Sequence, residues 1–269
     1  MSLIEVKNIT KRFDENIVLD NISFDVDEGD IFGLIGPNGA GKSTLINIMT
    51  GLWNPNAGDV IIGGYNIKTE PIKVKKQIGL VPQEVALMDT VSAYDNLEFF
   101  GSLYGLKGKL LKERIDEALE IIGLQDKKRE KVKKFSGGMK RRLNIAAAIM
   151  HHPRILIMDE PTVGIDPQSR NHIFEFTKRI NRENKTTIIY TSHYMEEVEM
   201  LCNNIFIMDL GQEVAYGSKS QIKSLISSNN KVNLKIYNYK AEMILDIKSM
   251  NGVIECTEED GLIKLLIDE

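Results

Sequence analysis

The chain has 269 residues, of which 42% are hydrophobic and 27% charged, the proportions of a globular protein with a large core. A net charge of −4 at pH 7 excludes a globally basic surface for nucleic acid, and two cysteines are too few for a disulfide framework. Apolar runs stay well short of the ~20 residues that a membrane-spanning helix requires, and the charged residues near the N-terminus argue against a signal peptide.

Most of the chain is predicted to alternate strands and helices. Alternating apolar and polar side chains predict antiparallel strands at residues 3–9 and 17–26. An apolar strand at 31–35 leads through a glycine-rich loop into a helix, and a strand hairpin follows at 60–67. A mostly helical region then extends from residue 84 to 150. Strands and helices are predicted in turn at residues 154–158, 169–184, 186–190, 194–202 and 204–217. This order indicates an α/β fold with a parallel sheet covered by helices.

The strand–helix alternation of the main domain ends at Gly217. A short helix at 218–226 and a polar linker precede a predicted strand, a helix and a hairpin over 231–269. About 40 residues are marginal as an independent core, so this part should pack on the main domain or pair with another copy. We therefore predict a main domain over residues 1–226 and a small C-terminal α+β appendage over residues 227–269.

The segment GPNGAGKST fits the phosphate-binding pattern G-x-x-x-x-G-K-[ST], with a predicted strand before it and a helix after it. A chance glycine turn would lack that context. Glycines let consecutive N–H groups point at one anion, and the helix N-terminus adds a partial positive charge. Lys42 can reach the β- and γ-phosphates, and the Ser43 hydroxyl can hold Mg²⁺. The residues expected to bind the phosphates are Gly36, Pro37, Asn38, Gly39, Ala40, Gly41, Lys42, Ser43 and Thr44.

Polar side chains follow three predicted strands at what should be the same sheet edge. Asp159 and Glu160 end the apolar strand RILIM, where a carboxylate can hold Mg²⁺ and its neighbour can polarise an attacking water. Gln83 ends QIGLVPQ and His193 follows TTIIYTS, so both can reach metal, water or the γ-phosphate. Each of these residues alone is as consistent with a strand meeting solvent. Together with the phosphate loop, they predict an NTP-hydrolysing site.

Two further features favour nucleotide binding less directly. Phe13 offers a ring face on which a base can stack, or it is an edge residue of the sheet core. Ser136, Gly137 and Gly138 open a helix and form a second anion cradle at its N-terminus. The basic run at 127–134 is either a solvated helix face or a source of positive potential near that cradle.

Taken together, GPNGAGKST, Gln83, FSGGM, LIMDEP, the GIDP that contains Asp166, and His193 resemble the ordered motifs of ATP-binding cassette (ABC) ATPases over residues 1 to about 220. The resemblance implies a P-loop NTPase with a RecA-like core, an antiparallel β subdomain and a helical subdomain at about 84–150. It departs from the family pattern at Phe135 and Met139, where Leu and Gln are usual.

The resemblance also implies roles for individual residues. Phe13 would stack on adenine, Asp159 would hold Mg²⁺, and Gln83 would sense Mg²⁺ and water. Glu160 would be the general base and His193 would contact the γ-phosphate. The cradle at 136–138 would complete the site of a second protomer, with Asp166 communicating between the two sites.

The TVGIDP and YTSHYMEE segments are similar to the ATPase subunits of bacterial drug, lipid and polysaccharide exporters. This similarity implies an ATP- and Mg²⁺-dependent motor that closes as a dimer and drives a permease encoded as a separate chain. We expect it in the cytoplasm, peripheral on the inner face of the cell membrane, with residues 84–106 docking on the permease and no nucleic-acid partner. The alternatives are an ABC ATPase acting on ribosomes or nucleic acid, and a P-loop kinase or GTPase switch, which would leave the second cradle unexplained.

Overall fold

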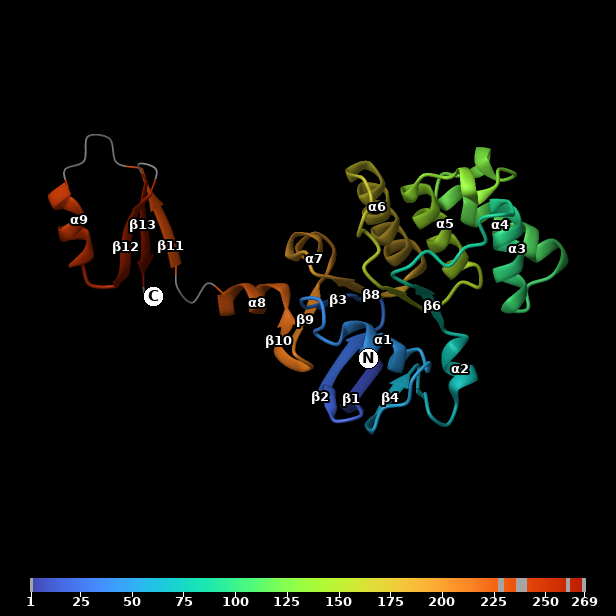
Figure 1. The fold of residues 1–269 in the computed structure, drawn as a ribbon, viewed down its shortest axis with the longest axis horizontal. Coiled ribbons are helices and arrows are strands. Elements are labelled where there is room, and N and C mark those ends of the chain that lie inside the picture. The colour runs from blue at the N-terminus through green and yellow to red at the C-terminus, as the bar shows by residue number, and fades with distance from the viewer. Residues whose placement is uncertain (1, 227–229, 236–240, 260–261, 268–269) are drawn as a thin grey trace. The chain divides into compact units, whose positions relative to one another are not determined.

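The structure is a computed structural model that describes residues 2–226, 230–235, 241–259 and 262–267. It divides into two compact units, Met1–Gly217 and Ser218–Glu269, which we describe separately. The expected strands and helices of the first unit are present in the expected order (Figure 1).

An antiparallel sheet begins the first unit, as the alternating pattern predicts. Its strands follow the order β2-β1-β4-β5, with bounds β1 (Ser2–Phe13), β2 (Asn16–Asp27), β4 (Ala57–Ile62) and β5 (Tyr65–Asn66). In β2 the side chains of Ile22, Phe24 and Val26 are buried and those between them are more exposed. The Phe24 ring stacks on Phe32 at 5.1 Å between centroids, which joins this sheet to the core of the unit.

A second sheet of six strands carries the carboxyl ends that matter for function. Its order is β10-β9-β3-β8-β7-β6, with bounds β3 (Ile31–Ile35), β6 (Ile78–Val81), β7 (Ile155–Met158), β8 (Thr187–Ser192), β9 (Asn204–Asp209) and β10 (Gln212–Ser218). The pairs β3–β8, β3–β9, β7–β8 and β6–β7 are parallel. Strands β3 and β7 are buried along their whole length, which is typical of a parallel sheet covered on both faces.

Helix α1 (Lys42–Met49) packs between the two sheets, because its buried apolar residues belong to the same core cluster as residues of β1, β2, β3 and β7. The other helices of this unit are α2 (Pro71–Lys75), α3 (Ala93–Leu103), α4 (Gly108–Ile121), α5 (Gly137–Ile149), α6 (Pro167–Asn184) and α7 (Met195–Leu201). Short 3-10 turns lie at Gln125–Lys127 and Val132–Lys134.

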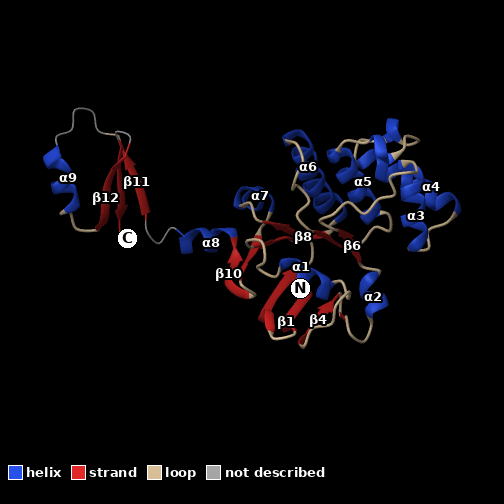
Figure 2. Cartoon of the chain, in the orientation of Figure 1, coloured by secondary structure: helices blue, strands red, loops and turns tan. Residues whose placement is uncertain are grey.

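The helical region has a core of its own, formed by apolar residues of α3, α4 and α5 (Figure 2). It begins later than residue 84, because Ser92 caps α3 in a reciprocal capping box with Asp95 and the preceding residues form a loop. Tyr94, which we expected on the docking surface, faces this core and is 9% exposed. Helix α2, whose Pro71 occupies the first helical turn, was not predicted from the sequence.

The second unit is a three-stranded sheet with one helix beside it and another before it. Its elements are α8 (Lys219–Ile226), β11 (Asn230–Leu234), α9 (Ala241–Lys248), β12 (Val253–Glu259) and β13 (Leu262–Ile267). The strand order is β11-β13-β12, with both pairs antiparallel and Cys256, Ile263 and Leu265 buried. The first strand predicted within residues 231–269 corresponds to β11, and the residues from 236 to 240 that follow lie outside the described residues. In the part of the chain that the structure describes, no helix combines the length and apolar character needed to span a membrane.

Candidate nucleotide-binding site

The phosphate loop joins β3 to α1 and can be built only with glycine at two positions. A Cβ on Gly36 would lie 2.2 Å from the backbone oxygen of Met208. Gly41 has a φ of +104° and is the N-cap of α1. The N-terminal amides of α1 are therefore presented at the mouth of a cavity of about 350 Å³. This cavity is lined by Val18, Asn38, Gly39, Gly41, Lys42, Ser43, Thr44, Gln83 and Glu160.

Lys42 lies buried in this loop with its ammonium group fully engaged. Its Nζ donates to the carbonyl oxygens of Gly36 at 2.7 Å and Pro37 at 3.0 Å. It also lies 3.4 Å from Oε1 of Glu160, with both side chains almost entirely buried. A buried ammonium surrounded by backbone oxygens and one carboxylate is a strong potential ligand for a phosphate oxygen.

Asp159, at the end of β7, lies beside Ser43 at the start of α1. The Ser43 hydroxyl donates to Oδ2 of Asp159 at 3.2 Å, and the Thr191 hydroxyl donates to Oδ1 at 2.8 Å. Burial raises the pKa of Asp159, while these two hydrogen bonds oppose the shift. A hydroxyl and a carboxylate oxygen in direct contact are ligands of the type that Mg²⁺ takes beside bound phosphates, so the pair fits that ion.

Glu160 is the point at which three predicted catalytic side chains meet. Gln83 Nε2 donates to its Oε2 at 3.2 Å. Nδ1 of His193 lies 3.5 Å from Oε1, an ion-pair distance at which no hydrogen bond forms. Glu160 has a φ of +44°, a region that non-glycine residues seldom adopt, and its backbone N–H donates to the Thr191 hydroxyl at 2.8 Å. The parallel sheet thus brings together side chains from the segments that directly follow β6, β7 and β8, together with Lys42 of α1.

The second cradle, at the N-terminus of α5, does not share this cavity. Ser136 caps α5 by accepting the Met139 N–H at 3.2 Å, and Ser136 and Gly137 are exposed. Gly138 is buried, and a Cβ there would lie 1.9 Å from the Ser169 hydroxyl oxygen. Of the described residues, those that line the phosphate cavity include none of this cradle.

Asp166 lies beside that second cradle, as the N-cap of α6. Its Oδ1 accepts the backbone N–H of Ser169 at 2.9 Å, and its Oδ2 accepts the Ser169 hydroxyl at 2.7 Å. These hydrogen bonds hold the pKa of Asp166 below its ordinary value. Because Ser169 also contacts Gly138, the structure places Asp166 next to the cradle of its own chain.

Phe13 lies at the end of β1 and is 40% exposed. Trp53 packs edge-on against its ring at 5.2 Å between centroids, and the Lys11 ammonium lies 4.9 Å from the ring centroid. Phe13 is therefore an accessible aromatic surface and not a core residue. It does not line the phosphate cavity, so its contact with a base stays a prediction.

Sequence reasoning missed several buried polar residues that hold these segments in place. Thr191 binds both Asp159 and the Glu160 backbone, as described above. The buried carboxylate of Glu197 accepts hydrogen bonds from the hydroxyls of Thr162, Tyr190 and Ser192. Ser192 and Thr162 flank the segments that carry His193 and Asp166. The sequence offered one indication of these residues: Thr191 and Ser192 are polar and lie directly before His193, at the end of a strand whose middle residues are apolar.

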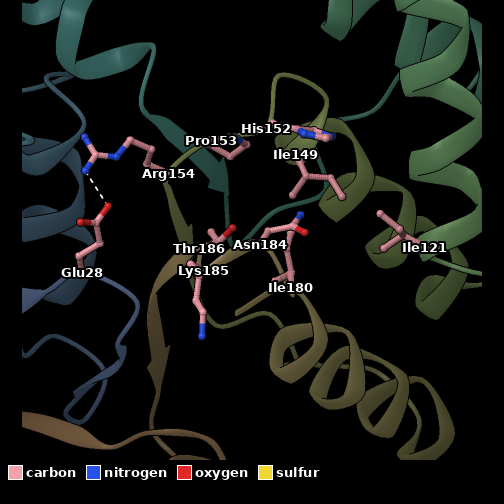
Figure 3. Close-up of a pocket in the computed structure, with 10 residues that line it drawn as sticks. All are labelled: Glu28, Ile121, Ile149, His152, Pro153, Arg154, Ile180, Asn184, Lys185 and Thr186. Carbon is pink, nitrogen blue, oxygen red and sulfur yellow. Dashed lines mark hydrogen bonds and ion pairs between the residues drawn. The ribbon is translucent and has the colours of Figure 1, made fainter. Parts of the chain in front are cut away.

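A separate cavity of about 200 Å³ opens at the amino ends of β7 and β8, the sheet edge opposite Asp159 (Figure 3). Arg154 and Glu28 form an ion pair on one side of it, at 2.7 Å between Nη2 and Oε1, while Ile121, Ile149 and Ile180 supply apolar walls on the other side. None of the predicted site residues lines this cavity.

Comparison with known proteins gives consistent results. Residues 19–163 match the family described as ABC transporter. The chain is 46% identical to the linearmycin resistance ATP-binding protein LnrL of Bacillus subtilis over 98% of this chain and 84% of that protein. It is 38% identical to the Nod factor export ATP-binding protein I of Cupriavidus metallidurans over 82% of this chain and 73% of that protein.

Solved structures agree with the family assignment. A dimeric ATP-binding cassette in a post-hydrolysis state, bound to ADP and Pi, superposes with a TM-score of 0.73 at 26% identity, covering 80% of this chain and 98% of that chain. The cbiO1 subunit of a cbiONQ ABC transporter complex from Clostridium perfringens superposes with a TM-score of 0.76 at 25% identity, covering 92% and 94%. The chain therefore belongs to the ABC transporter family, and it is a P-loop ATPase that binds adenine nucleotides.

Proposed function

We propose that this chain is the motor subunit of an ABC exporter, in which ATP-driven closure of a dimer acts on a separate membrane permease. Proteins named for linearmycin resistance, daunorubicin resistance and Nod factor export are among its relatives, at 46%, 36% and 38% identity. The observation that carries the proposal is the pair of helix N-termini: one is enclosed with the catalytic carboxylates, and the other is exposed to solvent. An exposed cradle of this kind suits the nucleotide of a second copy.

The residues of the enclosed site divide the reaction among them. Lys42 and the amides of α1 bind the phosphates. Glu160 accepts the proton of the attacking water, and Gln83 and His193 orient that water and the γ-phosphate. Ser43, Asp159 and Gln83 would hold Mg²⁺, which would neutralise charge on the phosphate oxygens. Lys42 lies 3.4 Å from Oε1 of Glu160, so the phosphate-binding ammonium and the general base are neighbours in this site.

The second protomer would close over the same nucleotide. Ser136, Gly137 and Gly138 of one chain would bind the γ-phosphate held by the other, and Asp166 would link the two sites. Uncleaved ATP then favours the closed dimer by differential affinity, and hydrolysis removes that preference.

The permease surface is proposed along residues 84–106 and the adjoining end of α1. Apolar side chains are exposed there, at Val85, Met88, Phe99, Leu103 and Tyr104. Beside them a cavity of about 230 Å³ is lined by Thr50, Leu52, Lys75, Ile78, Leu80 and Tyr104. This surface follows Gln83 directly in the chain, so a change in nucleotide state can be transmitted to it. It would place the subunit in the cytoplasm, against the inner face of the membrane.

The decisive experiment for the motor is Glu160→Gln, measured by ATP turnover and by size-exclusion chromatography with and without Mg-ATP. Glutamine keeps the size of the side chain but accepts no proton, so turnover should fall by about 10²–10⁴-fold while ATP still binds. The trapped nucleotide should shift the variant from monomer to dimer. A variant that binds ATP and stays monomeric, even with the permease present, would contradict the dimer mechanism.

The permease surface is tested by site-specific crosslinking. Single cysteines at Val85 and Met88 should crosslink to the membrane subunit, whereas cysteines at the exposed Met250 and Ile254 of the second unit serve as controls. The two native cysteines are buried, so the introduced thiols are the reactive ones. Crosslinks from the second unit alone would overturn the assignment of residues 84–106.

A further inference from the structure

A buried arginine in α5 joins the backbone segments that carry the proposed catalytic residues. Arg141 is 2% exposed, and it lies in the second turn of the helix that begins at the Ser136 cradle. Arginine has five N–H donors, and here five hydrogen bonds of 2.5–3.0 Å leave the guanidinium. All five end on backbone carbonyl oxygens, those of Pro82, Gln83, Asp159, Glu160 and Pro161.

The division of these bonds follows the planar shape of the group. Nη1 reaches the loop after β6, at Pro82 and Gln83, while Nη2 and Nε reach the loop after β7, at Glu160 and its two neighbours. A lysine ammonium has three donors around one atom and cannot span two loops in this way. The shape of arginine is therefore needed at this position, beyond its charge.

Arg141 fixes the backbone of Glu160 in an unfavourable conformation. Glu160 adopts a φ of +44°, and a non-glycine residue stays there only when its surroundings hold it. Its carbonyl accepts Nη2 of Arg141 at 2.7 Å, and its N–H donates to the Thr191 hydroxyl at 2.8 Å. These two contacts hold the peptide groups on both sides of its Cα, and so they set the direction of its carboxylate.

Gln83 is held by the same guanidinium. Its carbonyl accepts Nη1 of Arg141 at 3.0 Å, and its side chain donates to Oε2 of Glu160 at 3.2 Å. Arg141 therefore binds the backbone carbonyls of both Gln83 and Glu160, whose side chains are hydrogen-bonded to each other. Because Ser136 is the N-cap of α5, the same arginine connects the second cradle to this pair.

We propose that Arg141 is a positioning residue for ATP hydrolysis, which holds the backbones of Gln83 and Glu160 in register with α5. The inference rests on the proposed function, since it takes Glu160 as the general base. Arg141 need not touch the nucleotide. Its loss should therefore reduce turnover far more than ATP binding, because a catalytic group displaced by about 1 Å can cost about 10²-fold in rate.

The test compares Arg141→Lys and Arg141→Gln with Arg179→Lys. Arg179 is also partly buried and donates to a backbone carbonyl, that of Ile121 at 2.9 Å, but outside the site. For each variant we would measure thermal unfolding, ATP affinity without turnover, and the separate kcat and KM of ATP hydrolysis. Glu160→Gln is run in parallel, because turnover in that variant would reject the general base of the proposed function and not the role of Arg141.

The expected result is a folded Arg141→Lys whose kcat falls by about 10–10²-fold while its ATP affinity changes by less than about threefold. The kcat of Arg141→Gln should fall at least as far as that of Arg141→Lys, and Arg179→Lys should keep wild-type kcat. Wild-type kcat in a folded Arg141→Lys would overturn the inference, and so would equal losses of affinity and kcat. Failure of both Arg141 variants to fold, with Arg179→Lys folded, would show a requirement for folding and would overturn it as well.

Discussion

The N-termini of α1 and α5 are built from similar residues and yet differ in what surrounds them. Helix α1 follows a glycine-containing loop, α5 opens with Gly137 and Gly138, and the N-terminal amides of either helix can bind an anion. At α1 the neighbours are Lys42, Asp159 and Glu160, each less than 10% exposed. At α5 the cap is the exposed Ser136, whose hydroxyl accepts the N–H of Met139 in the first turn of its own helix.

This difference suggests separate tasks for the two cradles: the α1 cradle would bind the nucleotide, and the α5 cradle would complete the site of a second chain. The α1 cradle has Lys42, Asp159 and Glu160 beside it in the same chain, with Gln83 and His193 next to Glu160, so we expect it to hold a nucleotide alone. The α5 cradle lacks those neighbours in the structure described, but Arg141 links its helix to Glu160. Changes at Lys42, at Ser136 and in residues 229–269 test whether the two cradles act as two halves of one site, whereas a change at His151 tests stability alone.

The largest effect is expected from breaking the α1 cradle with Lys42→Ala. This change removes the buried ammonium that is proposed to bind the phosphates, and it leaves Glu160 without its neighbouring positive charge. ATP binding should weaken strongly, and turnover should fall by at least about 10²–10³-fold. Calorimetry with ATP and a phosphate-release assay provide the measurements. Near-normal turnover would remove Lys42 from the catalytic assignment.

Breaking the α5 cradle with Ser136→Arg should separate the two activities. The bulky side chain fills the exposed cradle, so turnover should fall by about 10²-fold while the isolated chain still binds ATP. In the Glu160→Gln background the same change should abolish the ATP-dependent dimer.

Mixing Lys42→Ala with Ser136→Arg sharpens this result. A mixed dimer pairs the intact α1 cradle of one chain with the intact α5 cradle of the other, which restores one of its two sites. With random pairing about half of the dimers are mixed, so about one site in four should recover activity. Two inactive variants whose mixture also stays inactive would contradict the composite site.

A smaller effect, on stability alone, is expected from His151, which lies away from both cradles. Its ring stacks on Tyr104 at 3.5 Å between centroids, and Nε2 lies 3.1 Å from the Ile78 carbonyl. Burial lowers the pKa of His151 to about 4. Between pH 6.5 and about 4 the unfolded chain therefore binds more protons, and the free energy of unfolding decreases as the pH falls.

His151→Phe keeps an aromatic ring beside Tyr104 but removes the titration. Relative to the wild type, its free energy of unfolding should fall less between pH 7 and pH 5, by about 1 kcal/mol after allowance for partial exposure. Urea unfolding of the nucleotide-free chain at the two pH values measures this difference. Parallel pH profiles for the two proteins would assign the acid sensitivity to other groups.

The smallest effect on catalysis is expected from removing residues 229–269. The predicted catalytic residues all lie before residue 194, and the second unit has its own small core at Cys256, Ile263 and Leu265. Turnover by the shortened chain should stay close to that of the whole protein, while dimer stability or regulation changes. A folded but inactive truncation would show that the second unit contributes to one of the cradles. The proposed division at residue 226/227 would then need revision as well.

The sequence predicted most of the elements because their patterns are local. Alternation marked β1 and β2, and continuous apolar runs marked the buried β3 and β7. Helix α2 was not predicted because five residues are too few to show a helical period. Tyr94 was misplaced on the surface because spacing alone does not tell which face of α3 meets the helical core.

For the site, the sequence by itself determined which chemical groups are available: glycine turns, a lysine, a hydroxyl, two acids, a glutamine and a histidine at the ends of predicted strands. Motif spacing could give this much because a phosphate loop is a local backbone structure. The tertiary structure decided which groups touch, because the parallel order of β6, β7 and β8 brings Gln83, Glu160 and His193 to one sheet edge. Only the tertiary structure shows that Arg141 binds the backbone carbonyl of Glu160. In the sequence this residue is one of three consecutive basic residues, and its burial depends on carbonyls from two loops distant in the chain.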